Sequence, residues 1–538
     1  MLFVLALSIA QAACPTFAEP DGEWGDRTEA AAEASDALAA LESYAFPAVM
    51  DEEERTGVRT DGLVIVRDGE ILYERYGRDW TADKTHLQWS ATKSVAASLT
   101  GMAVQQELLD IDASICDSIE VGSPEACQVT ARNLMEHASG FAWRETYEGQ
   151  SPTASSVVGM LYGAGMQDMS RFVTAHPIRD TPGTAYSYSS GDSLVLTSVA
   201  HTLLKKAHGE DYLQELLYGP LGITSAQFEV DGTGLPIGGS TLYLTPRDMV
   251  RYGSFLLQDG CWNGTRLLPE GWVARATTPA SSVDAKHIKP ITGALPGWNL
   301  WLNQTHPNIN GGRLPWPDTP EGTFAALGHW RQSIYVMPEQ GVVVARTGDD
   351  RDGSYSHNTL LSLVTAFVEA VPPAEAVAVA AEPEADAGAP EETSTETEST
   401  PEAASADSTV ADATEAADAT DASEPEPEPI TAPVRGFTPA AFPPPPLKPS
   451  GESTAVPPAK YDVSLLAIGT SYAALQGCTC RYISGRSEDA CIDYIRITPD
   501  IARAKFDDET RTVTAKAFGL AKTRAQPGPD GTGCRLID

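Results

Sequence analysis

Residues 89–94, WSATKS, decide how the rest of the chain is interpreted. They place Ser90 and Lys93 three residues apart at the predicted start of a helix, so both side chains lie on one helical face and can meet. A serine hydroxyl becomes a good nucleophile when a neighbouring base takes its proton, and a lysine can be that base when burial lowers its pKa. The apolar run at 95–104 predicts that this helix enters a core. The same pattern also occurs by chance on solvated helices, so its context has to decide.

The chain on either side of this pattern predicts the fold class. Residues 62–76 (GLVIVRDGEILYERY) indicate two strands around a turn at 67–69. Residues 332–347 (QSIYVMPEQGVVVART) indicate a second pair around a turn at 338–341. Helices are predicted at 28–41, 195–205 and 212–217. Strands at both ends with helices between them predict an α+β fold, in which an antiparallel sheet formed by the N- and C-terminal strands is flanked by helices and joined by a helical subdomain.

A second motif, TPGTAYSYSSGDS at residues 181–193, makes a family resemblance visible. A hairpin, then Ser-x-x-Lys, then Pro-Gly-Thr and Tyr-x-Ser resembles the β-lactamase-related (penicillin-recognising) serine hydrolase superfamily. The resemblance implies a β-lactamase/transpeptidase-like fold, with Ser90 as nucleophile, Lys93 as base and Tyr188 as a second proton-transfer residue. Tyr186 is the nearest competitor for that last role.

The superfamily carries Lys-Thr-Gly or His-x-Gly beside the nucleophile, and LGHWRQ at 327–332 stands in this place. His329 and Trp330 match the first two positions and are expected to line the cleft. The resemblance further implies that the backbone amides of Ser90 and Gln332 form the oxyanion hole. Arg331 stands where a glycine is expected, so we predict that its side chain narrows the cleft or binds an acidic substrate.

Within the superfamily, the chain is most similar to the branch of 6-aminohexanoate-dimer hydrolases and family VIII esterases, over roughly residues 55–370. Three segments carry this similarity: LMEHASGFAWRETY (134–147), GPLGI (219–223) and GCWNGTRLLPEGW (260–272). Trp143, with Glu145 and Tyr147, is a candidate cleft residue. Core and surface roles are the alternatives for these three side chains.

These motifs predict a serine hydrolase that cleaves a small ester or amide through an acyl-enzyme, with no cofactor and no metal. Two alternatives stay open. One is a DD-peptidase or β-lactamase, of the class C kind, that acts on cell-wall peptides or β-lactams. The other is a catalytically weak cell-envelope binding protein in which Arg331 blocks the cleft.

Composition divides the chain into four expected parts. Residues 1–13 resemble an export signal without its basic n-region and are too short to span a bilayer. The hydrolase domain is expected at 20–370. An Ala/Pro/Glu/Thr-rich linker follows at 371–459, with 17 acidic and no basic residues between Glu375 and Pro429; we expect it to be disordered, as a tether or a solvated spacer. Residues 460–538 predict a small cysteine-containing domain, with strands at 502–506 and 512–517, that could contact the cell envelope.

The cysteines and the charge bear on compartment and partners. Eight cysteines fit an oxidising compartment, hence a periplasmic or secreted protein, with lipid anchoring at Cys14 as the alternative. The net charge of −37 argues against nucleic acid and anionic membrane surfaces as partners.

The spacing of the cysteines suggests how they pair. Cys116 and Cys127 predict a local disulfide, whereas Cys261 has no evident partner. A zinc site fits the spacing of the last four cysteines poorly. The C-terminal unit resembles a small segment that precedes the hydrolase domain in some relatives, and this resemblance implies the pairs Cys478–Cys534 and Cys480–Cys491.

Overall fold

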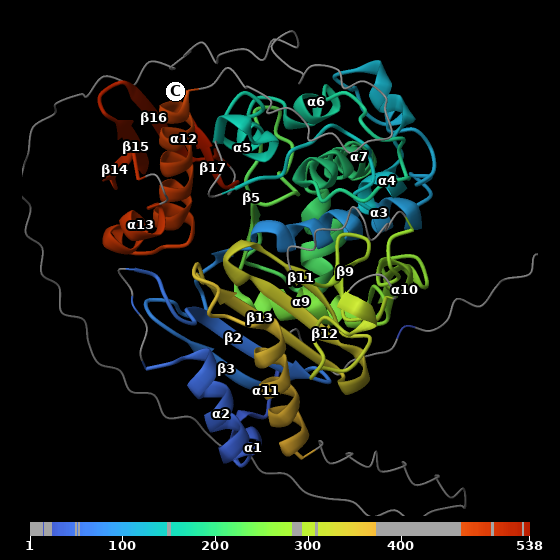
Figure 1. Ribbon diagram of the computed structural model, residues 1–538, viewed down its shortest axis with the longest axis vertical. Coiled ribbons are helices and arrows are strands. Elements are labelled where there is room, and N and C mark those ends of the chain that lie inside the picture. Colours follow the sequence, from blue (N-terminus) through green and yellow to red (C-terminus); the bar gives the residue numbers. More distant parts are fainter. Residues whose placement is uncertain are drawn as a thin grey trace, which may run out of the picture. The chain divides into compact units, whose positions relative to one another are not determined.

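The computed structural model describes residues 14, 24–48, 51, 54–147, 152–281, 293–306, 310–372, 464–496, 500–529 and 532–537. The expected export signal lies outside these residues, as does the expected linker beyond Pro372. The described residues before and after the expected linker, up to Pro372 and from Ser464 onward, belong to one compact unit (Figure 1). No helix among the described residues combines the length and apolar character needed to cross a membrane.

An eight-stranded sheet organises the first segment, in the order β1-β3-β2-β13-β12-β11-β10-β9. Neighbouring strands pair antiparallel, except β1 with β3, which pair in parallel. The expected arrangement is confirmed, because strands from the two ends of the hydrolase segment, β2 and β13, pair at its centre. The strands are β1 (Gly25–Asp26), β2 (Thr60–Arg67), β3 (Glu70–Tyr76), β9 (Leu295–Pro296), β10 (Trp301–Leu302), β11 (Phe324–Leu327), β12 (Ser333–Met337) and β13 (Val342–Gly348).

Turn chemistry fixes the two predicted hairpins. Asp68 and Gly69 both adopt positive φ, 51° and 84°, which is the two-residue turn that an Asp-Gly pair favours between twisted strands. The second hairpin closes through Gly341 at φ 64°, directly after a short turn of 3₁₀ helix. Both strand pairs are therefore set locally, and their central pairing brings distant parts of the chain together.

Helices cover both faces of the sheet, since successive residues of β2 are buried on both sides. Leu63 and Ile65 belong to a core shared with α2 (Ser35–Ala45) and α11 (His357–Ala370). Val64 and Val66 belong to the other core, which includes α9 (Pro246–Leu257). The single helix predicted at 28–41 is two helices, α1 (Thr28–Ala32) and α2.

The helical subdomain supplies most of the site. Its central pair is α3 (Lys93–Gln105) and α7 (Ser190–His208), which pack against each other. Around them lie α4 (Ala131–Met135), α5 (Ser156–Tyr162) and α6 (Met169–Thr174). The helix predicted at 212–217 is present, with a π-helical turn over Gln214–Tyr218.

The C-terminal unit is a four-stranded antiparallel sheet packed on one helix. The sheet runs β14 (Arg503–Asp507), β15 (Thr512–Ala517), β16 (Ala521–Pro527) and β17 (Cys534–Leu536), and it packs on α12 (Leu465–Cys478). Its second helix is α13 (Glu488–Tyr494). The first two strands were predicted, whereas the last two, poor in β-branched residues, were not. Arg486 pairs with Asp79 at 2.8 Å, and Thr479 Oγ1 donates to Glu229 at 2.6 Å, so this unit contacts the hydrolase segment directly.

Four disulfides join the eight cysteines. The predicted Cys116–Cys127 pair is confirmed, as are the pairs Cys478–Cys534 and Cys480–Cys491 that the resemblance implied. Cys261, which had no evident partner in the sequence, pairs with Cys14. That bond corrects the alternative of a lipid anchor, because a sulfur in a disulfide cannot carry a thioether-linked lipid.

Candidate active site

Ser90 and Lys93 meet at the entrance to α3. A short 3₁₀ helix, Trp89–Thr92, precedes α3 and places the Lys93 Nζ atom 3.1 Å from the Ser90 Oγ atom. Trp89, the residue before the serine, has φ 47°, a region that a bulky side chain occupies only when its surroundings enforce it. The sequence predicted the shared helical face correctly, although the turn between the two residues is tighter than an α-helix.

Burial makes Lys93 a candidate base. The side chain is 2% exposed, and burial lowers the pKa of its amine to about 8, although the carboxylate of Glu145 acts in the opposite direction. The amine also contacts Ser190 Oγ at 2.8 Å and the carbonyl oxygen of Gly239 at 2.5 Å. A large fraction of this lysine is therefore uncharged slightly above neutral pH.

Ser190 connects the amine to Glu145. Its hydroxyl donates to Glu145 Oε1 at 2.6 Å, and its backbone N–H donates to Oε2 at 2.9 Å. Trp143 Nε1 donates to the same carboxylate at 2.5 Å, and the Tyr147 hydroxyl donates to it as well. Because Ser190 begins α7, the carboxylate also lies at a helix N-terminus, where negative charge is favourable.

Tyr188 faces the same amine. Lys93 Nζ lies 5.2 Å from the centre of the Tyr188 ring, which stacks on Trp301. Burial and the charge of Glu145 raise the pKa of the phenol, and a hydrogen bond with Ser90 opposes that rise. Tyr186, the competitor, packs edge-on against His137. The structure thus brings Ser90, Lys93 and Tyr188 together.

A small cavity of about 230 Å³ adjoins these three side chains. Its far wall comes from β9, β10 and the loop between them. His137 also faces it, and burial with the nearby Lys93 charge lowers the pKa of this imidazole to about 3. The described lining is Ser90, Lys93, His137, Tyr186, Tyr188, Pro296, Gly297, Asn299, Leu300 and Trp301.

The turn at 329–331 lies beside the turn that carries Ser90 because Gly328 permits a close approach. A Cβ atom on Gly328 would collide with the carbonyl oxygen of Gln88, two residues before Ser90. His329 stacks on Tyr147 with ring centres 5.4 Å apart, and Trp330 packs edge-on against Trp89 at 5.5 Å. The two aromatic side chains of the third motif are therefore next to the nucleophile-bearing turn.

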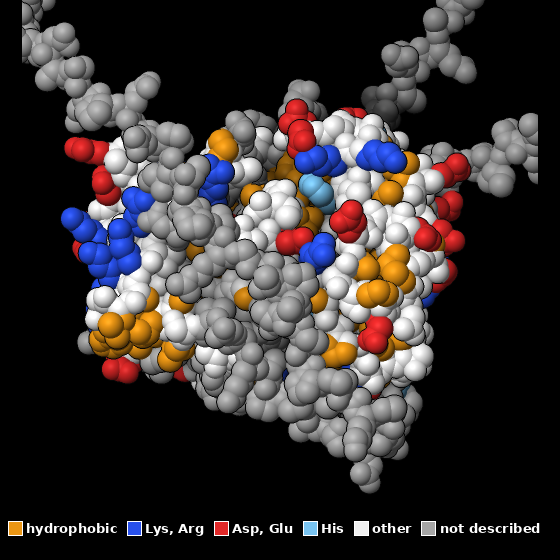
Figure 2. Space-filling model, turned by 90° about the horizontal axis from the view of Figure 1, so that it is seen from above, with side chains coloured by type: hydrophobic (Ala, Val, Ile, Leu, Met, Phe, Trp, Pro, Cys, Tyr) orange, Lys and Arg blue, Asp and Glu red, His pale blue; other side chains and the backbone are white. Residues whose placement is uncertain are grey.

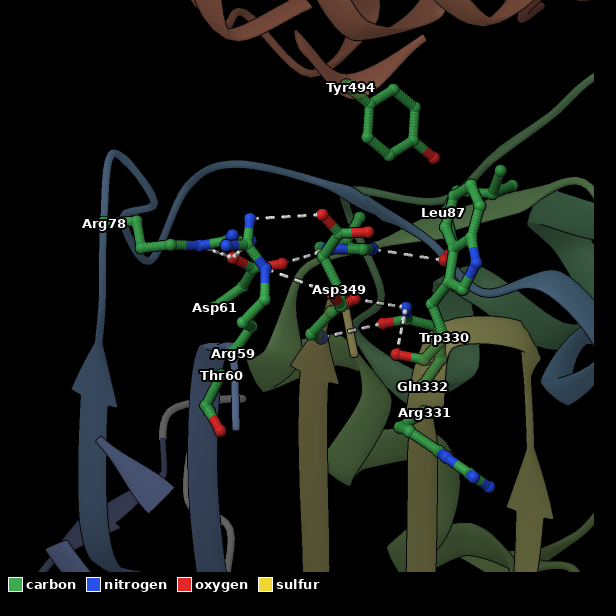
Figure 3. A network of polar contacts seen from close by, with 12 residues as sticks. Arg59, Thr60, Asp61, Arg78, Leu87, Trp330, Arg331, Gln332, Asp349 and Tyr494 are labelled. Atoms are coloured by element: carbon green, nitrogen blue, oxygen red, sulfur yellow. Dashed lines mark hydrogen bonds and ion pairs between the residues drawn. The ribbon is translucent and has the colours of Figure 1, made fainter. Parts of the chain in front are cut away.

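Arg331 points away from this cavity, which corrects the prediction that it narrows or blocks the cleft. Figure 3 shows its side chain on the side opposite to Trp330, and its Nη1 atom lies 3.4 Å from Nε2 of His357 on α11. The backbone explains the reversal. Arg331 has φ 71°, a conformation that favours glycine. The arginine therefore keeps the backbone of the expected glycine, and its side chain extends toward α11 on the other side of the sheet.

Gln332 and Trp143 hold other parts of the site in place. The Gln332 side chain is fully buried and donates to the carbonyl oxygen of Gly348 at 2.7 Å, so it fixes the turn to β13 and does not line the cavity (Figure 3). Trp143 is buried against Phe172 and His176 and reaches the site through Glu145. Both side chains are positioning groups in this geometry, which corrects their expected place in the cleft.

Sequence reasoning missed His137 and the β9–β10 wall. His137 lay inside a quoted segment, LMEHASGFAWRETY, but nothing in its spacing linked it to Lys93. Residues 295–301, LPGWNLW, carry no catalytic pattern, and only the pairing of β9 with β10 brings them to Tyr188. Glu145 was considered as a cleft residue, and its bond to Ser190 is the feature that the sequence did not reveal.

The family assignment follows from comparison with known proteins. Residues 45–356, more than half of the chain, match the Beta-lactamase family model, and the chain belongs to this family. The predicted superfamily is confirmed, and with it the expectation of a serine hydrolase. The match ends before the C-terminal unit.

Individual relatives are distant. The 6-aminohexanoate-dimer hydrolase of Paenarthrobacter ureafaciens is 23% identical over 309 residues, which cover 48% of this chain and 73% of that protein. Among solved structures, a putative 6-aminohexanoate-dimer hydrolase from Bacillus anthracis has 20% identity and a TM-score of 0.45, covering 57% of this chain and 78% of its own. A family VIII carboxylesterase of known structure has 15% identity and a TM-score of 0.46, and the match covers 64% of this chain and 99% of that one.

Proposed function

We propose that this protein hydrolyses a small ester or amide through an acyl-enzyme on Ser90. The observation that carries the proposal is the buried amine of Lys93, which lies 3.1 Å from Ser90 Oγ and has a pKa lowered to about 8. Buried titratable groups with such shifts cluster at catalytic sites. The family and its esterase and amidase relatives support the same reaction class.

The contacts of Lys93 suit a neutral amine as general base. Such an amine has two N–H donors and one lone pair. The donors are directed at Gly239 O and Ser190 Oγ, which leaves the lone pair for the proton of Ser90. Because Ser190 donates its own proton to Glu145, its oxygen is free to accept from the amine.

The reaction then proceeds in two halves. Ser90 Oγ attacks the carbonyl carbon while its proton passes to Lys93, which gives a tetrahedral intermediate with negative charge on the former carbonyl oxygen. The backbone amides of Ser90 and Gln332 are the proposed donors to that oxygen. Collapse breaks the bond to the leaving group, which receives a proton through Tyr188. Water attacks the acyl group in the second half, releases the acid and restores Ser90.

The cavity favours a small, uncharged acyl group. The cavity beside Ser90 is small, with about 230 Å³ of empty space that includes its opening to solvent. Within the described lining, Lys93 and His137 are the only basic side chains, and neither offers a guanidinium to a carboxylate. This lining favours a simple ester or amide over a carboxylate-bearing β-lactam or peptide, and the reversed Arg331 removes the reason for a blocked cleft.

Covalent labelling tests the proposal. A fluorophosphonate probe should label the full chain, the modified peptide should contain Ser90, and short nitrophenyl esters should be turned over. Ser90→Ala should abolish both signals. Ser193→Ala is the control: it removes the hydroxyl of another buried serine, in α7, that donates to Asn299, and this variant should keep the label. Labelling by a fluorescent penicillin with no ester turnover would establish the peptidase or lactamase activity instead. Absence of both labels would support the binding-protein alternative.

We also propose that the protein acts in an oxidising compartment outside the cytoplasm. Four disulfides distributed over the hydrolase segment and the C-terminal unit support this location. Contact of the C-terminal unit with the cell envelope is part of the same proposal.

A further inference from the structure

The outer face of the C-terminal sheet is basic in an otherwise acidic chain. Strand alternation turns Phe506, Val513, Ala515 and Ala525 inward, where they are buried in the core that includes α12. The residues between them face outward, and six of these are cations. They are Arg503, Lys505, Lys516, Lys522, Arg524 and Arg535.

The strand register gathers these cations into one patch, which we call the basic face. Lys516 on β15 pairs directly with Arg503 on β14 and with Lys522 on β16. Two residues further along, Thr514 stands between Lys505 and Arg524. Arg503 forms an ion pair with Asp500, and further acidic side chains lie in the turn at 507–509, which joins β14 to β15. Like charges placed side by side repel one another, so a bound anion stabilises this face.

An apolar tip extends from the same two strands. Phe518 and Leu520, in the turn between β15 and β16, are 74% and 81% exposed, far more than any other large hydrophobic side chain among the described residues. Phe518 and Gly519 both have positive φ, so the turn is a tight one between neighbouring strands. Lys516 and Lys522 flank it directly. Figure 2 shows basic and apolar side chains gathered near each other at the edge of the molecule where this sheet lies.

We propose that the C-terminal unit docks on the surface of an anionic phospholipid membrane, with Phe518 and Leu520 inserted among the lipids and the basic face against the phosphate groups. An aromatic and an aliphatic side chain at the end of a hairpin match the interfacial region of a bilayer. Cations within a Debye length of anionic lipids add attraction that salt screens. A nucleic acid or an acidic polymer would use the basic face but would leave the apolar tip in water.

This local arrangement differs from what the net charge of −37 indicates, because that sum covers the whole chain and 17 of its excess negative charges lie between Glu375 and Pro429. The proposal does not depend on the hydrolase reaction. The two can fail separately, since one is read from vesicle binding and the other from labelling of Ser90.

Vesicle co-sedimentation of the full chain tests the docking. We expect binding to vesicles of phosphatidylglycerol and phosphatidylcholine, weak binding to pure phosphatidylcholine, and a decline as salt rises. Phe518→Ser with Leu520→Ser should weaken binding on the order of tenfold or more, since each side chain loses its transfer from water. Lys516→Glu with Lys522→Glu should weaken it at least about 25-fold, because each basic residue near such a surface contributes about fivefold.

Matched variants on the hydrolase segment provide the control. Leu108→Ser removes another exposed apolar side chain, 37% exposed, and Lys206→Glu reverses an exposed lysine in the last turn of α7. Both should bind vesicles as the wild type does, and all variants should keep nitrophenyl ester turnover. Equal binding to neutral and anionic vesicles, or full binding by the tip variant, would overturn the proposal. A third outcome would also overturn it: the wild type and the tip variant bind heparin equally well, and neither binds vesicles. That result would identify an anionic polymer as the partner.

Discussion

Two buried clusters of charge follow opposite rules. In the Lys93 cluster, formed by Lys93, Ser90, Ser190 and Glu145, the cation has no direct ion pair and reaches its carboxylate only through a hydroxyl. In the arginine network, formed by Arg59, Arg346, Arg351, Asp349 and Asp350, every guanidinium touches a carboxylate directly. Figure 3 shows part of this network at the ends of β2 and β13.

The difference separates a reactive charge from structural ones. Desolvation without a direct counter-ion lowers the pKa of Lys93 to about 8, which suits the proposed role of its amine as a base. Desolvation with a direct counter-ion keeps the charge in place, as for Arg346, which pairs with Asp350 at 2.6 Å while both side chains are 0% exposed. The account therefore predicts that substitutions in the two clusters have opposite effects on rate and on stability.

Lys93→Met should have the largest effect on rate. Loss of the general base should lower kcat/KM for a nitrophenyl ester by about 10²- to 10⁴-fold. Stability should not fall at pH 7. The native pKa of about 8 lies below the ordinary 10.5, so burying this lysine opposes folding below about pH 8, and that cost declines as the pH rises toward 10.5. Steady-state kinetics and urea unfolding measure the two quantities. A clear loss of stability with little loss of rate would contradict the assignment.

Asp350→Ala should show the reverse pattern. It leaves Arg346 buried without its counter-ion, which should reduce the free energy of unfolding by about 3–5 kcal/mol. The folded fraction should keep ester turnover within a few fold, because this pair does not touch the cavity. The matched control is Asp112→Ala, which breaks a more exposed pair with Arg132 and should cost less than about 1 kcal/mol. Equal losses for the two variants would show that the network is not the buried structural element described here.

Glu145→Gln should leave a larger fraction of Lys93 uncharged at a given pH below the optimum. The Glu145 carboxylate raises the pKa of Lys93, so its removal should lower that pKa and shift the rising limb of the pH–rate profile to more acidic pH. We expect a decrease in kcat of about tenfold at the optimum, since the hydroxyl of Ser190 then donates to a neutral amide oxygen in place of a charged carboxylate. Trp143→Phe removes one donor to the same carboxylate but keeps its charge, and its profile should stay near that of the wild type. A shift of the limb to higher pH would refute this arrangement.

Arg351→Ala should have the smallest effect on rate, although it also removes the ion pair with Asp349. The guanidinium lies 3.7 Å from the centre of the Trp330 ring, and its Nη1 atom donates to the Arg496 carbonyl oxygen of the C-terminal unit. Loss of the cation–π contact, worth roughly 1 kcal/mol, should loosen Trp330 and raise KM a few fold with kcat nearly unchanged. Arg247→Ala, on a more exposed pair with Glu74, is the control. A change confined to kcat would argue against a role in shaping the cleft.

The sequence predicted what local chemistry and family motifs determine. The Asp68-Gly69 hairpin, the encounter of Ser90 with Lys93, and the late strand pair all depend on residues a few positions apart. Tyr188 came from a motif match; its ring centre lies 5.2 Å from Lys93 Nζ, and its role stays a prediction. The four-part division of the chain stays an expectation, since its linker and export signal fall outside the described residues.

What the sequence could not predict depends on contacts between distant residues. The Ser190–Glu145 bond spans 45 positions, and the Cys14–Cys261 bond spans 247. The direction of Arg331 depended on a backbone angle that the motif did not reveal, since an arginine took the conformation of the expected glycine. The basic face of the C-terminal sheet required β16 and β17, whose alternation of small and charged residues gave a weak strand signal.

The pH dependence of covalent labelling at Ser90 shows whether Lys93 activates this hydroxyl. The second-order rate constant for fluorophosphonate labelling should be measured from pH 6 to 10, with the modified residue identified by mass spectrometry. The account predicts that Ser90 carries the label and that the rate rises through a single transition near pH 8, as Lys93 loses its proton. A label on another residue, or a rate that does not change across this range, would contradict it.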